Sequence, residues 1–402
     1  MREAIKITFI GDVLCDAEMS KRLEPYYDAR TGSYDFKSVF APMKGHLSKS
    51  DYVFANLETP LSAQTDKLTD KQYEFCSHIS FAEALKGIGV RCVSAANNHC
   101  LDRGHAGLLD TIRCLERLGL RYAGIHDTAV EREPVVIDIE GCKVGFLAYT
   151  YGTNAFSNNQ YLAFRERKAV DLLQAQEEDR LILRSPYAYM GKHKKSPLAK
   201  LYFKTREKWI RKPVYERRNV NLYRRLLLGR DIRALKAKGV DKLFFYLHIG
   251  GQYNREPTSY TKKMVAYLMK KGCDIVVANH EHVIHGFVQD ADRTKLGTYA
   301  LGNFLGSAGT LHPPYDRCCD FSILLHAYLD PKSKEILRFT YSITKTVYRE
   351  KTEKFEVHPV WELVETLGER ERREMTERAL QAAFLFSGKK ESVLLEEFHL
   401  IS

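Results

Sequence analysis

Apolar and polar positions along this chain alternate in a rhythm of short strands and longer amphipathic helices. Seven short apolar runs have the pattern of strands, and the run within 241–251 is apolar enough to be buried on both faces. They occupy residues 5–12, 51–58, 90–99, 142–150, 241–251, 273–282 and 298–304. Helical spacing of apolar residues lies between them, as at 105–119 and 258–272. This alternation predicts an α/β fold in which mainly parallel strands are covered by helices.

The pattern changes after Asp320. Residues 320–330 and 336–348 are longer alternating runs separated by PKSKE, which predicts an antiparallel hairpin at one edge of a sheet. We therefore expect a main domain over 1–350 and a charged helical tail over 351–402. Residues 155–235 interrupt the α/β rhythm with prolines, aromatic residues and basic residues, which predicts a basic insert within the main domain.

Polar residues of few kinds stand at the ends of the predicted strands. They are Asp12, Asn56, Glu58, Asn97, Asn98, His99, His248, Asn279, His280, His282 and Asn303. Because the carboxyl ends of parallel strands share one edge of a sheet, where ligands bind, these side chains are expected to converge. The alternative is that they are ordinary turn residues, since Asn, Asp and Gly favour turns for local reasons. We interpret His285 and His312 as packing or surface residues.

Carboxylate and imidazole ligands together suit Mn, Zn or Fe, and a carboxylate can bridge two ions. His280 and His282 are two residues apart, so they could serve different ions if the chain turns there. Two ions about 3.5–4 Å apart would clamp both oxygens of a phosphoryl displacement. The sequence therefore predicts a centre of one or two divalent ions.

The composition places limits on the class of protein. With 402 residues the chain can bury a large core, and 44% hydrophobic with 28% charged residues is typical of globular proteins. No apolar stretch approaches the ~20 residues of a membrane helix, and the first residues do not resemble a secretion signal. We therefore expect a cytoplasmic protein that can be peripheral to a membrane. The nine scattered cysteines predict buried thiols instead of a disulfide framework.

The net charge of +11 comes from one segment. Residues 184–225 hold fourteen Lys or Arg and two Glu, so the rest of the chain is close to neutral. The candidate anion-binding residues in this segment are Lys194, Lys195, Arg211, Lys212, Arg217 and Arg218. An anionic polymer, a phosphorylated substrate, an anionic membrane surface or a simple solvated surface would fit them. Nucleic acid is the less favoured partner, because the body of the chain is not basic.

Six short blocks of sequence resemble, in order, the signatures of the CapA family. The blocks are GDVLCD, ANLETPLS, SAANNHCLDRG, HIGGQY, ANHEHVIHG and LGNF. This family comprises bacterial capsule (poly-γ-glutamate) synthesis proteins with a calcineurin-like metallophosphoesterase fold. The resemblance runs from about residue 5 to 350 outside the basic insert. It implies a four-layer α-β-β-α sandwich of two facing mixed sheets.

The resemblance also implies roles for the strand-end residues. The implied metal ligands are Asp12, Glu58, Asn98, His248, His280 and His282, with Glu58 bridging two ions. It implies that His99 protonates a leaving group and that Asp102 orients His99. The residues expected beside the ligands, without binding metal, are Asn56, Asn97, Gln252 and Asn303.

Three positions depart from the pattern of active phosphoesterases. Leu14 stands where those enzymes have a histidine, as is usual for the CapA branch, Gln252 replaces a carboxylate, and Asn279 replaces a histidine. One metal site would then keep only Asp12, Glu58 and His282. Three functions remain open: a metal-dependent phosphoester hydrolase, a non-catalytic capsule-assembly factor that binds an anionic polymer through the basic segment, and a nuclease or nucleotide phosphodiesterase. Contact with a membrane surface or with other capsule proteins would suit the first two.

Overall fold

All seven apolar runs contain strands in the computed structural model, which describes residues 3–69, 71, 73–174, 176, 218–307 and 318–400. The strands are β1 (Ile5–Val13), β4 (Tyr52–Leu57), β7 (Val90–Ser94), β10 (Cys142–Thr150), β11 (Lys242–His248), β12 (Ile275–Asn279) and β14 (Leu296–Leu301), the last followed by β15 (Asn303–Leu305). The two helical patterns form α5 (Gly104–Leu118) and α11 (Ser259–Lys270). Gly119 ends α5 in the left-handed conformation, and the Thr258 side chain caps α11.

A nine-stranded mixed sheet is built around β1. Its strand order is β18-β17-β16-β1-β4-β7-β8, and β15 also pairs with β1 and β19 with β17. The strands not yet bounded are β8 (Arg121–Ala123), β16 (Phe321–Leu329), β17 (Ile336–Arg349), β18 (Lys354–Pro359) and β19 (Phe398–His399). β16 and β17 form the expected antiparallel hairpin. The expected edge position is wrong, because β16 pairs with β1 and β18 covers β17.

A second, six-stranded sheet has the order β13-β14-β12-β11-β10-β9. Its four central strands are parallel, and β9 (Val135–Ile139) and β13 (Ile284–Gln289) pair antiparallel at its edges. This sheet is therefore also mixed, as the family resemblance implies.

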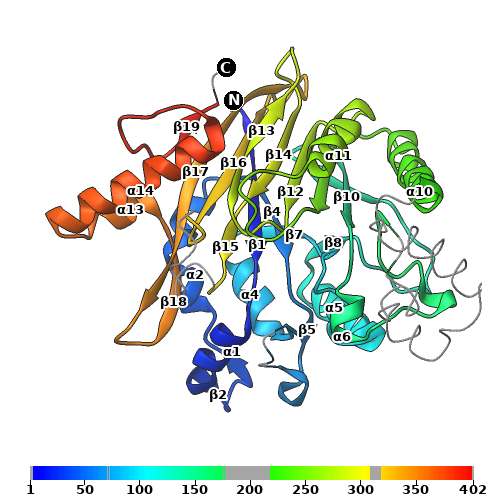
Figure 1. The fold of residues 1–402 in the computed structure, drawn as a ribbon, viewed down its shortest axis with the longest axis horizontal. Coiled ribbons are helices and arrows are strands. Elements are labelled where there is room, and N and C mark those ends of the chain that lie inside the picture. The colour runs from blue at the N-terminus through cyan, green and yellow to red at the C-terminus, as the bar shows by residue number, and fades with distance from the viewer. Residues whose placement is uncertain are drawn as a thin grey trace, which may run out of the picture.

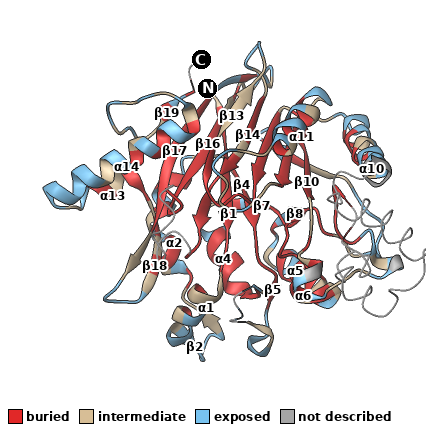
Figure 2. Ribbon diagram, viewed as in Figure 1, coloured by how far each residue is buried: buried red, intermediate tan, exposed pale blue. Residues whose placement is uncertain are grey.

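The two sheets face each other across an aromatic core. Phe9 and Phe54 of the first sheet meet Phe244 of the second, with ring centroids of Phe9 and Phe244 5.1 Å apart. The outer face of the first sheet packs against α2 (Lys37–Phe40), α4 (Ile79–Gly87) and α5. The outer face of the second packs against α10 (Arg218–Ala237) and α11. The expected four-layer α-β-β-α sandwich is thus confirmed, and its strands are the most buried part of the molecule (Figures 1 and 2).

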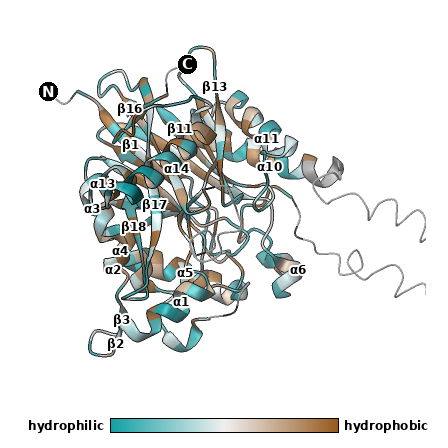
Figure 3. Ribbon diagram, turned by 60° about the vertical axis from the view of Figure 1, so that its left-hand side comes forward, coloured by the Kyte–Doolittle hydropathy of each residue, from teal (hydrophilic) through white to brown (hydrophobic). Residues whose placement is uncertain are grey.

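The remaining elements complete the fold. They are α1 (Ala17–Leu23), β2 (Tyr27–Asp28), β3 (Ser33–Tyr34), α3 (Lys44–Leu47), β5 (Leu61–Ser62), β6 (Ser77–His78), α6 (Ala155–Asn158), α13 (Val360–Glu365) and α14 (Glu369–Ser387), with short 3-10 turns at Glu24–Tyr26, Ala41–Met43, Thr65–Lys67 and Phe164–Glu166. Figure 3 shows hydrophobic residues gathered on the strands and hydrophilic stretches on the surrounding helices.

The basic insert does not extend over the whole of 155–235, and this is a correction. α10 packs Leu228, Ile232 and Leu235 into the core of the second sheet, and the chain then enters β11. At the other end of the range, Val170 and Leu172 bridge to Ile125 and Thr150. The sequence pattern did not reveal that α10 belongs to the core, because its apolar residues form one face of a helix that is otherwise basic. Residues 177–217 lie outside the described part of the chain.

The expected tail 351–402 also needs correction. It contains the helices α13 and α14 but also β18 and β19, which extend the nine-stranded sheet.

All nine cysteines lie among the described residues as buried thiols, as expected. Within the described residues, every helix is too short or too polar to cross a bilayer.

Candidate metal centre

The predicted strand-end residues converge where the two sheets meet. Asp12 of β1 lies opposite Asn56 of β4 and Asn303 of β15, and His248 of β11 lies opposite Asn279 of β12. Glu58 follows directly on β4. These side chains are all buried, Glu58 completely. The physical reason is the parallel pairing, which brings the carboxyl ends of these strands to one edge.

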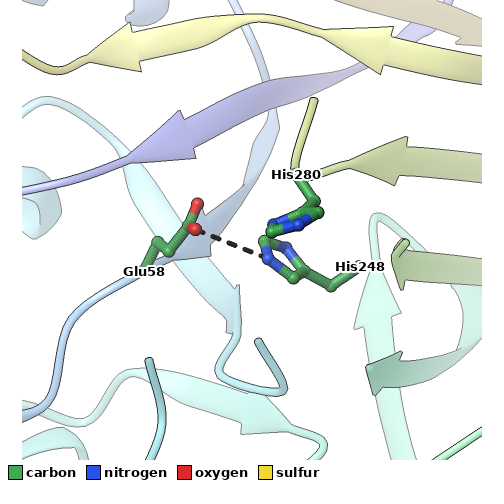
Figure 4. A group of neighbouring side chains, drawn as sticks. All are labelled: Glu58, His248 and His280. Atoms are coloured by element: carbon green, nitrogen blue, oxygen red, sulfur yellow. Dashed lines mark ion pairs between the residues drawn. The ribbon is translucent and has the colours of Figure 1, made fainter. Parts of the chain in front are cut away.

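One group of possible ligands consists of Glu58, His248 and His280 (Figure 4). Their ligand atoms lie within 4.8 Å of one another. Glu58 Oε1 is 3.4 Å from His248 Nε2. Neither Glu58 Oε1 nor His280 Nδ1 has a hydrogen-bond partner among the described residues, although both are buried. Buried polar atoms without partners are costly, so a ligand that satisfies both atoms is expected.

A second group consists of Asp12, Glu58 and His282, again with ligand atoms within 4.8 Å. His282 Nδ1 lies 3.6 Å from Asp12 Oδ2, and His282 Nε2 lies 3.9 Å from Glu58 Oε1. Glu58 belongs to both groups. His280 and His282 fall in different groups because the chain turns sharply there, with φ of 106° at His280 and 57° at His282. Such φ values in residues other than glycine store strain and cluster at functional sites.

The electrostatics of the cluster favour a cation. Burial raises the pKa of Glu58 to about 8 and, together with the charge of Glu58, raises that of Asp12 well above its usual value. Burial also lowers the pKa of His248 to about 4 and that of His282 to about 3. Without a cation the cluster is therefore held neutral, and a divalent ion would stabilise the carboxylates. This mixture of oxygen and nitrogen donors fits a divalent metal such as Mn, Zn or Fe.

Asparagine side chains hold the ligand groups in place. Asn56 Nδ2 donates to Asp12 Oδ1 at 2.7 Å and lies 3.3 Å from His248 Nδ1. Asn303 Oδ1 lies 2.8 Å from His282 Nδ1. Asn98 Oδ1 lies 2.7 Å from His248 Nε2, so its amide sits beside the first group. These contacts fix ring orientation, which tunes metal ligands in proteins.

Asn97 and Gln252 lie at the edges of the site. Asn97 Nδ2 donates to the Leu57 carbonyl at 2.7 Å, and its Oδ1 accepts from the His99 backbone N–H at 3.1 Å. Asn97 therefore ties the turn that carries His99 to the end of β4. Gln252 Nε2 is 3.5 Å from His282 Nε2, which places it at the border of the second group.

His99 and Asp102 form a buried pair. His99 Nδ1 lies 2.6 Å from Asp102 Oδ2, which also accepts the Phe75 backbone N–H at 2.7 Å. Asn158 Nδ2 donates to the other oxygen of Asp102 at 3.1 Å. The Phe75 ring stacks on the His99 ring with centroids 3.9 Å apart. The ring plane and the tautomer of His99 are thus both fixed, with Nδ1 protonated toward the carboxylate.

Two of the departures have a structural explanation. Leu14 is buried and apolar, and its backbone N–H donates to Leu305 at the end of β15. Asn279 Oδ1 accepts the Leu301 backbone N–H at 3.2 Å, so this residue ties β12 to β14. Neither side chain adds a ligand to the two groups.

Four residues of the site were not predicted from sequence. Phe75 and Asn158 contact the His99–Asp102 pair, and the Tyr151 hydroxyl lies 2.9 Å from His280 Nε2. Glu281, which lies between the two histidines in sequence, is buried with its carboxylate against Gly250. Tyr151 directly follows the end of β10, so the strand-end rule could have found it. Phe75 and Asn158 lie in loop and short-helix segments without any periodic signal.

Not every expected residue lies within the described part of the chain. Lys194, Lys195, Arg211, Lys212, Arg217 and His312 are outside the described residues, and Arg218 is described only as the first residue of α10. His285 is buried, with Nε2 3.1 Å from the Asn254 carbonyl oxygen, which is a packing position.

The family model and the similar proteins described below all point to the same family of capsule synthesis proteins. A family model described as bacterial capsule synthesis protein PGA_cap matches residues 6–308. "Capsule biosynthesis protein CapA" of Bacillus anthracis is 22% identical over 311 residues, covering 76% of this chain and 61% of the relative. "PGA biosynthesis protein CapA" of Bacillus subtilis is 20% identical over 310 residues, covering 76% and 64%. The chain thus spans less than two thirds of either relative.

Among solved structures, a phosphatase of Mycoplasma pneumoniae aligns with 85% of this chain and 94% of its own. The sequence identity is 14% and the TM-score is 0.39.

Proposed function

Because this chain belongs to the bacterial capsule synthesis protein PGA_cap family, we propose that it is a metal-dependent hydrolase of capsule synthesis. Its substrate would be a phosphoester, or a related bond, in an anionic cell-envelope polymer or its precursor. The observation that carries this proposal is the pair of buried ligand groups that share Glu58. No other cluster of this kind occurs among the described residues.

The residues divide into two metal-holding sets. Glu58, His248 and His280 would hold one ion, with the amide of Asn98 beside them, and Asp12, Glu58 and His282 would hold the other. A divalent ion supplies Lewis-acid catalysis, because it activates water and offsets charge on the phosphoryl group. Asn56 and Asn303 keep the ligands oriented through the hydrogen bonds described above.

His99 is the proposed general acid. Asp102 holds the proton on Nδ1, so in the charged imidazolium the proton on Nε2 is the one available to a leaving group. Phe75 restricts the ring plane by stacking, and Asn158 keeps Asp102 in place. This arrangement restricts His99 to one orientation, which favours proton transfer at one point of the site.

The test combines metal analysis of protein purified without chelators with turnover of an aryl phosphodiester. We expect bound divalent metal, and a loss of turnover of about 10²–10⁴-fold in His99→Ala without loss of metal. His399→Ala, at an exposed position on β19, is the matched control and should retain activity. Turnover unchanged in His99→Ala would refute the assigned role.

A non-catalytic capsule-assembly factor is the second candidate. It is favoured by the second ligand group, in which the described residues supply three donors and Leu14 supplies none. Absence of both stoichiometric metal and turnover would support this candidate. Oligonucleotide binding with a steep salt dependence would instead support the nuclease alternative.

A further inference from the structure

The helices α10 and α11 both cover the outer face of the six-stranded sheet, and each exposes its other side to solvent (Figure 2). They contact each other at two points. Lys236 Nζ of α10 donates to the Lys271 carbonyl oxygen at the end of α11, at 2.9 Å. Nearer the start of α10, the Arg225 guanidinium lies over the Tyr267 ring of α11, 5.6 Å from its centroid. The two helices therefore present one continuous outer surface.

The outward side of α10 carries large apolar side chains. Leu222 and Leu226, one helical turn apart, are 56% and 61% exposed, whereas Leu228 on the opposite side is fully buried. Arg233 follows Leu226 by two turns and therefore lies on the same outward side. Its Nη1 would lie 3.6 Å from a β carbon on Gly229, so the guanidinium is directed back toward the leucines. This side of α10 thus exposes apolar groups with a cation next to them.

The same surface is basic, and its charges are not compensated. α11 contains no acidic residue, and the single acid of α10, Asp231, is buried and pairs with Arg132 and Arg230. The exposed acids next to the two helices in sequence are Asp241 and Glu256. Against these two stand six exposed cations that form no ion pair within the described residues, namely Arg225, Arg233, Lys262, Lys263, Lys270 and Lys271. These six cations and the two exposed leucines are called here the α10–α11 surface.

We propose that the α10–α11 surface docks on an anionic lipid bilayer. Its cations attract the anionic headgroups, and the leucines of α10 enter the boundary between headgroups and acyl chains. A dissolved anionic polymer would also be attracted by the cations, but it would leave the leucines in water. The exposed apolar side chains therefore favour lipid over such a polymer. The proposal goes beyond the proposed hydrolase and does not depend on the metal centre.

The test is flotation of the full chain with vesicles of phosphatidylcholine alone and of phosphatidylcholine mixed equally with phosphatidylglycerol. We expect binding to the mixed vesicles only. The double variant Lys263→Glu, Lys270→Glu should weaken this binding about tenfold or more. Arg370→Glu, Arg373→Glu changes the net charge equally on exposed positions of α14, at the opposite side of the molecule (Figure 1). This control should weaken binding less than about twofold, because its charges are screened at that distance.

A neutral variant separates lipid docking from attraction by charge alone. Leu222→Gln, Leu226→Gln removes the exposed apolar groups without changing charge and should weaken vesicle binding about tenfold. Val393→Gln, Leu395→Gln is the matched control, at positions 63% and 46% exposed near the end of the chain, and should bind normally. Thermal unfolding of each variant shows that the fold is intact.

Three results would overturn the proposal. The first is failure of the wild-type chain to bind the mixed vesicles, and the second is equal weakening in the α14 variant. The third is unchanged vesicle binding in the leucine variant, which would leave a dissolved polyanion as the partner of this surface.

Discussion

At the scale of single residues, Glu58 determines whether the two ligand groups act as one centre. Its side chain is fully buried, and its Oε1 lies 3.4 Å from one imidazole and 3.9 Å from another. Asn56 Nδ2, at 3.5 Å, is close to its second oxygen. A carboxylate in this position can bridge two cations, whereas a neutral side chain of the same shape cannot supply the charge.

Glu58→Gln should therefore lower metal affinity by at least about tenfold. The same change should alter the free energy of unfolding of the metal-free protein at pH 7 by less than about 1 kcal/mol. Burial raises the pKa of Glu58 to about 8, so the wild-type side chain is mostly protonated at that pH and resembles glutamine. Metal analysis and thermal unfolding with and without added Mn²⁺ check both parts. Wild-type metal content in the variant would contradict the bridging role.

At the scale of elements, the approach of β15 to β1 positions Asp12. A β carbon on Gly11 would lie 2.1 Å from the Gly302 carbonyl oxygen, which accepts the Asp12 backbone N–H at 3.1 Å. Only glycine permits this contact, because no L side chain fits at such a distance. The glycine before Asp12 is thus part of the geometry of the site.

Gly11→Ala should destabilise the fold by about 2–4 kcal/mol and reduce metal content. The control is Gly45→Ala in α3, where a β carbon meets no atom within 4 Å. That change should be neutral or stabilise by about 0.5–1 kcal/mol, because alanine favours helix. Urea unfolding of both variants gives the comparison. Equal stability of the two would mean that the close contact is not essential.

The helix α10 gives a second prediction at this scale. Leu228 is fully buried against the six-stranded sheet, whereas Leu226, two residues earlier, is 61% exposed. Leu228→Ala should cost about 2–5 kcal/mol of stability, and Leu226→Ala less than about 0.5 kcal/mol. If urea unfolding finds the two equal, α10 does not belong to the folded core.

At the scale of the whole molecule, the end of the chain is fastened to its beginning. Glu397 Oε2 accepts from Lys6 Nζ of β1 at 2.5 Å, and Glu397 Oε1 accepts from the hydroxyls of Tyr328 and Thr340. Burial opposes ionisation of Glu397, but His326, Lys6 and the two hydroxyls outweigh burial and lower its pKa to about 2. The first and last parts of the described chain therefore form one body.

This linkage predicts an acid-sensitive contribution to stability. The pKa of Glu397 is lower in the folded than in the unfolded state, so the contribution is present above about pH 4.5 and is lost as the pH falls toward 2. Glu397→Gln should cost about 2–3 kcal/mol at pH 7 and much less near pH 2. Urea unfolding of both proteins across this pH range measures the difference. A cost independent of pH would show that packing, not ionisation, is responsible.

Most of the fold could be predicted because it depends on local pattern. The apolar runs of β1 or β11 need no partner to be recognised, and Gly119 and Thr258 mark helix ends by their own chemistry. The predictions were wrong for two kinds of segment. In α10 the many basic residues masked the apolar face in the sequence pattern, and β18 is a short strand that is recognised only by its pairing with β17. Composition alone does not separate such segments from an insert or a tail.

The sequence by itself determined which residues are the candidate metal ligands, because Asp12, Glu58, His248, His280 and His282 stand at or just after strand ends. Tertiary structure alone decided their grouping: Glu58 lies in both sets, and the turn at His280 and His282 separates two imidazoles only two residues apart. Tertiary structure also placed Phe75 against His99, Tyr151 beside His280 and Asn158 beside Asp102. The physical reason is that strand ends follow from periodicity along the chain, whereas contacts between distant segments depend on how two sheets pack.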